Sequence, residues 1–316
     1  MRYPALHSSI LGGAGLLSPL ASTLLEILDA VLVEGYLRGE VPVSSLGWSL
    51  VFDRYLNTAV YRPSEGLQLL YRVDDNRESA SYQVAQVTCY ESMSDVNTGF
   101  GGWGTLFFGK ACGSDVQNML KYSPPWWLIG DSKGFYLLIG DYYSYLPDSV
   151  RGTPVVMHYL GDFESLRAGD GYNTMIAGHA DPNVMSSDTG AFFKSYGSFG
   201  VTHSAGYAYA EASGGALGAA IGLTKPEGGR TIGSGVTAVN PLNLSTGDEI
   251  PRLSPMLISN TTGPRGKMPG LFSVWPNIAG ATGDTFTNSA GDSFMIANVE
   301  IAAGFWEQYA IQLNAW

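Results

Sequence analysis

The chain has 316 residues, and its 17 lysines and arginines against 28 aspartates and glutamates give a formal net charge of −11. An acidic surface repels phosphate groups, which argues against coating nucleic acid or binding a membrane through basic residues. Only 14% of the residues are charged and 45% are hydrophobic, which is too apolar for a disordered chain and poorer in charge than the ~25% usual in soluble domains. We therefore expect partners to cover much of the surface.

The clearest predicted element is a helix over residues 19–33. Ser18 is a favourable N-cap, and the proline that follows it suits the first helical position. Leucine, isoleucine and valine recur at helical spacing from residue 20 to residue 31 and predict one apolar face. Gly35 is a natural stop for this helix. The apolar runs that precede the helix are too short for a secretion signal or anchor, and we expect neither.

Most of the remaining chain reads as strands, because β-branched and aromatic residues alternate with clusters of Gly, Pro, Asn and Asp. The stretches 67–74 and 82–90 flank a polar segment, which predicts an antiparallel pair. Further strands are expected at residues 59–62, 155–160, 256–259, 271–275, 294–302 and 309–313.

The strongest predicted hairpin joins residues 126–130 to residues 135–139. The intervening loop begins with Asp131 and ends with Gly134, which is the chemistry of a chain reversal. Both arms are apolar on both faces. We therefore expect this hairpin to lie inside a sandwich or at a subunit interface.

These patterns predict a mainly β protein, with an antiparallel β-sandwich or jelly-roll-like fold, one N-terminal amphipathic helix and long glycine-rich loops. The 41 glycines favour turns over long helices. The first interpretation is one domain with a glycine-rich excursion around residues 195–235. The alternative is two units, with the helix and a β domain in residues 1–180, and a glycine-rich arm and C-terminal β region in residues 181–316.

Little in the sequence points to catalysis or metal binding. His179 and Asp181 lack a nearby third ligand. Some carboxylates could pair for sugar hydrolysis, namely Asp74, Asp75, Glu91 and Asp95, and adjacent Asp74, Asp75 and Asn76 could bind calcium. Solvated loops and turns are the favoured interpretation of both groups. Two cysteines are too few for a disulfide framework, and we expect buried thiols. We expect no enzyme, no catalytic residue, no cofactor and no metal.

Aromatic residues are numerous, and Trp and Tyr contribute large buried area in cores and at interfaces. We expect the clustered aromatics to serve as such anchors, with a sugar-stacking platform as the alternative. The interface candidates are Trp103, Trp126, Trp127, Tyr142, Tyr143 and Trp275.

Several strings together resemble a family of tailed-bacteriophage virion proteins. They lie at residues 47–48, 57–62, 71–75, 90–99, 265–271 and 283–286, and the most telling reads Tyr-Glu-Ser-Met-Ser-Asp-Val-Asn-Thr-Gly from Tyr90 to Gly99. The resemblance covers most of residues 20–175 and part of residues 260–290. It implies a non-enzymatic structural component of the particle, with no catalytic residues to carry over.

The resemblance further implies a place in the tail, baseplate or neck of a virion that is assembled in the bacterial cytoplasm. A head decoration protein and a tail module that binds a receptor or carbohydrate are the alternatives. We expect the partners to be other virion proteins and copies of this chain, in a cyclic homo-oligomer of about two to six copies. We expect no nucleic-acid partner and no membrane insertion.

Overall fold

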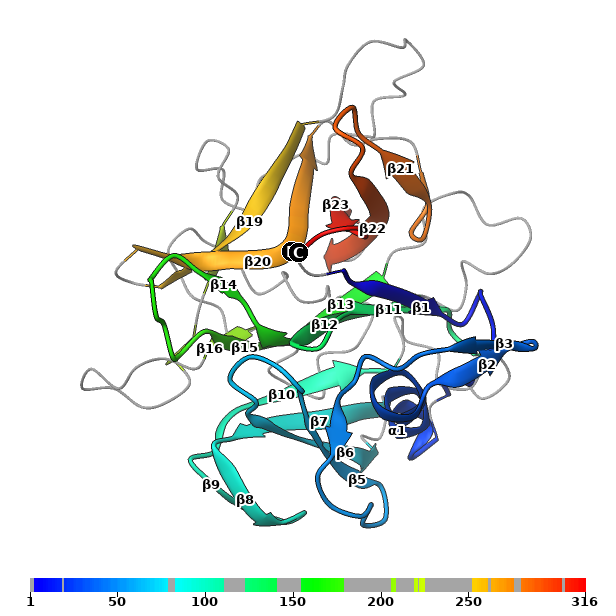
Figure 1. The fold of residues 1–316 in the computed structure, drawn as a ribbon, viewed down its shortest axis with the longest axis vertical. Helices are drawn as coiled ribbons and strands as arrows, with labels where there is room; N and C mark the ends of the chain where they lie inside the picture. The colour runs from blue at the N-terminus through cyan, green and yellow to red at the C-terminus, as the bar shows by residue number, and fades with distance from the viewer. Residues whose placement is uncertain are drawn as a thin grey trace.

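The computed structural model describes residues 3–18, 20–78, 83–110, 123–140, 155–178, 206–208, 219–220, 222–224, 252–260, 263–275, 280–302 and 305–316. The protein is mainly β, with a short helical segment near the N-terminus packed beside two large sheets (Figure 1). The predicted antiparallel, sandwich-like fold class is therefore confirmed. Within the described ranges, no helix has the length and apolar character that crossing a bilayer requires.

The helical segment begins later than the sequence predicts. It consists of α1 (Thr23–Leu28) and a π-helical continuation, η1 (Asp29–Glu34). Ser22, just before α1, has a left-handed backbone with φ 70°, so a regular helix cannot run through it. Gly35 ends the segment as predicted, at φ 79°. The apolar face is buried through Leu24, Leu25, Ile27, Leu28, Val31 and Leu32.

The smaller sheet has five antiparallel strands in the order β10-β7-β6-β5-β4. Their bounds are β4 Ser49–Leu50, β5 Thr58–Arg62, β6 Leu70–Glu78, β7 Gln83–Tyr90 and β10 Trp103–Gly109. The predicted pairing of β6 with β7 is confirmed, with Tyr71 opposite Cys89. Strand β10 was not predicted, because the two glycines in it interrupt an otherwise strand-like run.

The larger sheet contains the order β1-β11-β12-β13-β22-β23-β20-β19-β18. The bounds are β1 Ala5–Ser8, β11 Trp126–Gly130, β12 Gly134–Gly140, β13 Val155–Asp162, β18 Gly222–Thr224, β19 Arg252–Asn260, β20 Gly263–Trp275, β22 Ser293–Ala302 and β23 Phe305–Gln312. Shorter strands attach to it as branches, namely β14 Glu164–Ser165, β15 Thr174–Ala177, β16 Gly206–Ala208, β17 Ala219–Ala220 and β21 Thr285–Thr287. A parallel bridge from Val155 to Val299 joins strands from both sides of residue 180 into this sheet.

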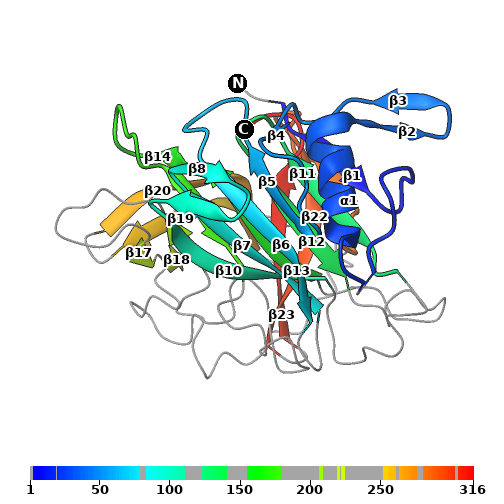
Figure 2. The same cartoon turned by 90° about the horizontal axis from the view of Figure 1, so that it is seen from below.

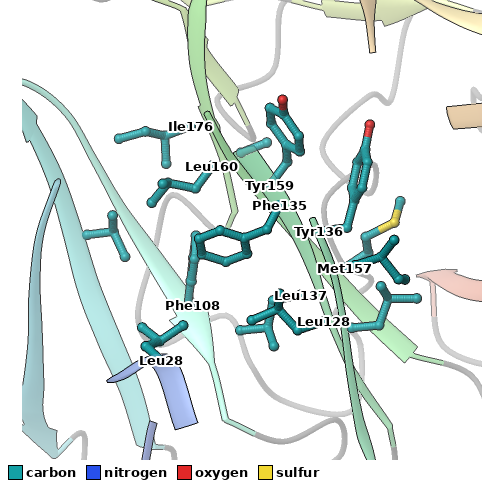
Figure 3. Close-up of a cluster of buried hydrophobic side chains, with 14 of the residues drawn as sticks. Leu28, Phe108, Leu128, Phe135, Tyr136, Leu137, Met157, Tyr159, Leu160 and Ile176 are labelled. Atoms are coloured by element: carbon teal, nitrogen blue, oxygen red, sulfur yellow. The ribbon is translucent and has the colours of Figure 1, made fainter. Parts of the chain in front are cut away.

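The hairpin of β11 and β12 forms as predicted and lies inside the molecule. Asp131 Oδ1 accepts hydrogen bonds from the Lys133 and Gly134 amides, at 2.8 and 3.1 Å, which fixes the turn. Every residue of both strands is buried. Phe135 packs edge-on against Trp48 on one face, and the Tyr136 hydroxyl donates to the Pro269 carbonyl at 2.9 Å on the other (Figure 3 shows both rings).

A carboxylate fastens the loop between β5 and β6 to the larger sheet. Asp162, at the end of β13, accepts hydrogen bonds from the Leu67 amide at 2.9 Å and from the Thr174 hydroxyl at 2.5 Å. The loop approaches so closely that a Cβ on Gly66 would lie 1.9 Å from Asp162 Oδ2. Only glycine fits at this position, which also has φ 76°.

Candidate assembly surface

The N-terminus of α1 is capped by a carboxylate from another part of the chain. Ser22 makes no side-chain capping bond. Asp75 in β6 supplies the acceptor, and its Oδ2 lies 3.0 Å from the Leu24 amide. A bulge between Asp74 and Arg77 displaces this part of β6 from regular pairing. The anion thus sits at the positive end of the helical segment, where the backbone amides lack partners of their own.

Asp75 is also one half of a buried ion pair. The Lys110 ammonium, just after β10, lies 2.5 Å from Asp75 Oδ1, and both side chains are almost fully buried. The same ammonium donates to the Leu20 carbonyl at 2.7 Å. Burial raises the pKa of Asp75, and Lys110 acts against that rise. The pair joins β6, β10 and the start of α1, and this gives Asp75 a structural role.

The other candidate carboxylates also have local roles. Asp74 forms an ion pair with Arg72 at 3.4 Å. Asp95 accepts a hydrogen bond from the Asn97 amide at 2.8 Å in the turn of a small hairpin, β8 (Ser92–Asp95) and β9 (Thr98–Phe100). That bond lowers the pKa of Asp95. Glu91 precedes the same hairpin, and its amide donates to the Phe100 carbonyl.

No group of three potential metal ligands occurs among the residues that the structure describes. His179 and Asp181 lie outside those residues, as does His203. His158 is fully buried in β13 and stacks on Phe108 with 4.5 Å between ring centroids. The arrangement of His158 is that of a core side chain.

His7 in β1 is fully buried and contacts a second small hairpin, β2 (Tyr36–Arg38) and β3 (Val41–Val43). Its Nδ1 lies 2.9 Å from the Tyr36 hydroxyl oxygen. Burial, together with the Arg38 guanidinium, lowers the pKa of His7 from 6.5 to about 4. A neutral imidazole therefore joins the edge of the larger sheet to the hairpin.

Acid should loosen this junction. In the unfolded chain His7 has a pKa near 6.5, whereas in the folded chain its pKa is about 4. Between these two pH values the unfolded state binds a proton that the folded state does not, so the free energy of unfolding decreases as the pH falls from 6.5 towards 4. We expect a loss of about 3 kcal/mol across that window. Urea titrations at pH 7 and pH 4 measure it, and His7→Gln, which cannot be protonated, should lose correspondingly less. An equal loss in His7→Gln would contradict this role of His7.

Three of the six interface candidates are core residues of this chain. Trp126 is 0% exposed, and Trp103 and Trp127 are 4% and 3% exposed. The Trp126 indole donates to the Gly15 carbonyl at 3.3 Å. These side chains therefore belong to the core cluster of this chain and form no surface platform for sugars. Tyr142 and Tyr143 lie outside the described residues, and the backbone of Trp275 ends β20.

Among the described residues, the exposed large apolar side chains are most frequent in the first 41 residues. Six of them belong to the loop after β1 or to the β2–β3 hairpin, and we name this set the N-terminal surface: Ile10, Leu11, Leu16, Leu20, Leu37 and Val41. The first part of that loop packs on the hairpin, because a Cβ on Gly13 would lie 2.3 Å from the Leu37 carbonyl oxygen. The sequence pattern missed this surface because most of these residues precede the helix or lie in a short strand.

The hairpin extends away from the two large sheets. Figure 2 shows β2 and β3 projecting beside α1, away from the labelled strands of the two large sheets. Leu37 and Val41 are 60% and 65% exposed. A two-stranded hairpin buries little of its own surface and gains stability by packing against something else. By the register of the hairpin, Leu37 shares one face with Pro42 and Val41 shares the other with Arg38, so an exposed apolar side chain lies on each face.

Two comparisons with known proteins complete this description: the chain matches no protein-family model, and it matches no curated protein.

Proposed function

We propose that this chain is a non-enzymatic structural component of a tailed-phage virion, located in the tail, baseplate or neck. It acts by assembling with copies of itself and with other virion proteins. The observation that carries the proposal is the N-terminal surface, where apolar side chains are presented on defined backbone instead of being buried in the chain's own core. Covering such side chains is favourable by about 25 cal/mol for each Å² removed from water.

The strings that resemble virion proteins fall on both large sheets, because residues 265–271 lie in β20 and residues 283–286 reach β21 of the larger sheet, whereas three others lie in the smaller sheet or the hairpin after it. Residues 57–62 and 71–75 lie in or beside β5 and β6, and residues 90–99 run from the end of β7 into β9. They therefore build the smaller sheet and the β8–β9 hairpin that follows it. This sheet holds Asp75 and, through its β5–β6 loop, contacts Asp162. The strings at residues 57–62, 71–75 and 90–99 thus fall on the part of the fold that contacts α1 through Asp75.

The buried charged residues support a structural function. Asp75 and Lys110 are used to cap and fasten α1, and Asp162 is used to hold a loop. Burying charge is costly unless it is paired. Here the pairing connects separate elements of the fold, which is what a rigid building block requires.

Cross-linking mass spectrometry on purified particles of the phage that encodes the chain tests this function. Lys133 and Lys267 are 31% and 43% exposed, so both can react with an amine-specific cross-linker. We expect a fixed number of copies per particle, with cross-links to tail, baseplate or neck proteins. Absence of the chain from washed particles would overturn the proposal, and cross-links confined to the head shell would move it to the head-decoration alternative.

A further inference from the structure

We propose that the Asp75–Lys110 ion pair holds α1 one turn short, and that residues 18–22 form a further helical turn when the pair is released. This conformational switch goes beyond the proposed function, because it is a property of the isolated chain. Its consequence concerns the N-terminal surface, since Leu20 belongs both to that surface and to the segment that becomes helical.

The ion pair occupies the two backbone groups that the missing turn would join. In a regular helix the Leu24 amide donates to the Leu20 carbonyl, four residues earlier. Here the Leu24 amide donates to Asp75 Oδ2 at 3.0 Å, and the Leu20 carbonyl accepts from Lys110 Nζ at 2.7 Å. Asp75 Oδ1 and Lys110 Nζ are themselves 2.5 Å apart. The two side chains are therefore inserted between the donor and the acceptor of one helical bond, which stops the helix at that point.

Ser18 already makes the hydrogen bond of a helix N-cap. Its Oγ accepts from the Leu20 amide at 3.1 Å, and in a helix that begins at residue 19 this amide is the second one, which an N-cap side chain binds. The proline after Ser18 suits the first position of such a helix. Thr23 Oγ1 also donates to the Ser18 carbonyl at 2.7 Å. The start of a longer helix is thus partly assembled ahead of α1.

Ser22 is the residue that separates this start from α1. Its φ of 70° is left-handed, and a residue with a Cβ is less stable there than in the right-handed helical conformation. The Ser22 hydroxyl donates to Asn57 Oδ1, which helps to hold the strained backbone. Rotation of Ser22 to a right-handed conformation relieves the strain and lets its amide donate to the Ser18 carbonyl.

The additional turn changes the position of Leu20. In the present structure the Leu20 side chain is 59% exposed, whereas Leu24 is 0% exposed. Side chains four residues apart lie on the same face of a helix. Formation of the turn therefore moves Leu20 from the N-terminal surface towards the buried face that carries Leu24. The ion pair thus controls whether Leu20 is presented on the surface.

Ser22→Gly and Ser22→Ala form a matched pair that tests the switch. Both remove the hydroxyl that binds Asn57, and they differ in that glycine tolerates a left-handed backbone whereas alanine favours a helix. With the ion pair present, Ser22→Gly should be the more stable variant, with an unfolding equilibrium constant about fivefold smaller than that of Ser22→Ala. In the D75L/K110M background the order should reverse by about the same factor. Urea denaturation at pH 7 measures both comparisons.

Amide hydrogen exchange at Leu24 locates the change. D75L/K110M lacks the carboxylate that binds this amide, so the amide stays protected only if the Leu20 carbonyl replaces it. Adding Ser22→Gly to this background should speed the exchange about fivefold relative to adding Ser22→Ala. A carbonyl is a weaker acceptor than a carboxylate, so the double variant remains less stable than the natural chain. D75A/K110M, with less bulk at position 75, is a second background and should give the same reversal.

Two results would each overturn the proposal. One is that glycine remains the more stable residue at position 22 in both backgrounds, and the other is that the Leu24 amide exchanges equally fast in the glycine and alanine variants. Neither result bears on the presence of the chain in virions, which is measured on particles, so the switch and the proposed function fail separately.

Discussion

Replacing Lys110 by methionine is expected to lower the free energy of unfolding by about 3–5 kcal/mol, because Asp75 then stays buried without its cation. The ammonium touches both Asp75 and the Leu20 carbonyl, so its loss also frees the segment that leads into α1. Urea denaturation at pH 7, followed by tryptophan fluorescence, measures the change. The start of α1 should exchange amide hydrogens faster than the strands of the smaller sheet.

The double variant D75L/K110M separates the ion pair from simple packing. Removing both charges leaves neither one uncompensated, so we expect it to be more stable than Lys110→Met alone. It should remain less stable than the natural chain, since the Leu24 amide loses the acceptor that Asp75 provides. If Lys110→Met cost less than 1 kcal/mol, the pair would not be the fastening that the geometry indicates.

Trp126→Ala is expected to destabilise the fold by about 3–5 kcal/mol, which is the usual cost of emptying a large buried site. Trp126 is 0% exposed, and its indole bond to Gly15 is lost as well. Thermal and urea unfolding of dilute, monomeric protein measure the effect. Trp126→Phe, which keeps most of the volume, should cost clearly less.

The contrast with an exposed residue makes this prediction specific. Leu16 is 70% exposed, so Leu16→Ser should change the stability of the isolated chain by less than about 0.5 kcal/mol. Trp126 should thus affect folding and Leu16 should not. If Trp126→Ala left stability unchanged and altered only association, the indole would be an interface anchor after all, as one interpretation of the sequence has it.

Local patterns were sufficient where the deciding interactions are local. The β11–β12 hairpin follows from Asp131 and Gly134 at the ends of a four-residue loop, and Asp131 indeed binds the turn amides. Gly35 ends the helical segment because its left-handed φ suits glycine. The β6–β7 pair follows from two strand-like runs around a polar loop.

Local patterns failed where a distant residue decides. Ser18 and the proline after it favour an early helix start, but α1 begins at Thr23, where Asp75 provides the cap. Residues 29–34 continue as a π-helix whose carbonyls at Val31 and Leu32 accept bonds from the Leu46 and Trp48 amides. Such contacts join residues far apart in sequence, so the local spacing of apolar residues cannot predict them.

The amino-acid sequence by itself determined the fold class, the main strands and the low-charge, acidic character of this protein, because those properties depend on composition and on short-range periodicity. Only the tertiary structure decided which apolar residues face inward. Tryptophans 103, 126 and 127 are enclosed between packed layers, while Leu37 and Val41 remain on a projecting hairpin. Burial depends on which elements pack against each other, and apolar side chains at a core and at a contact surface are chemically alike.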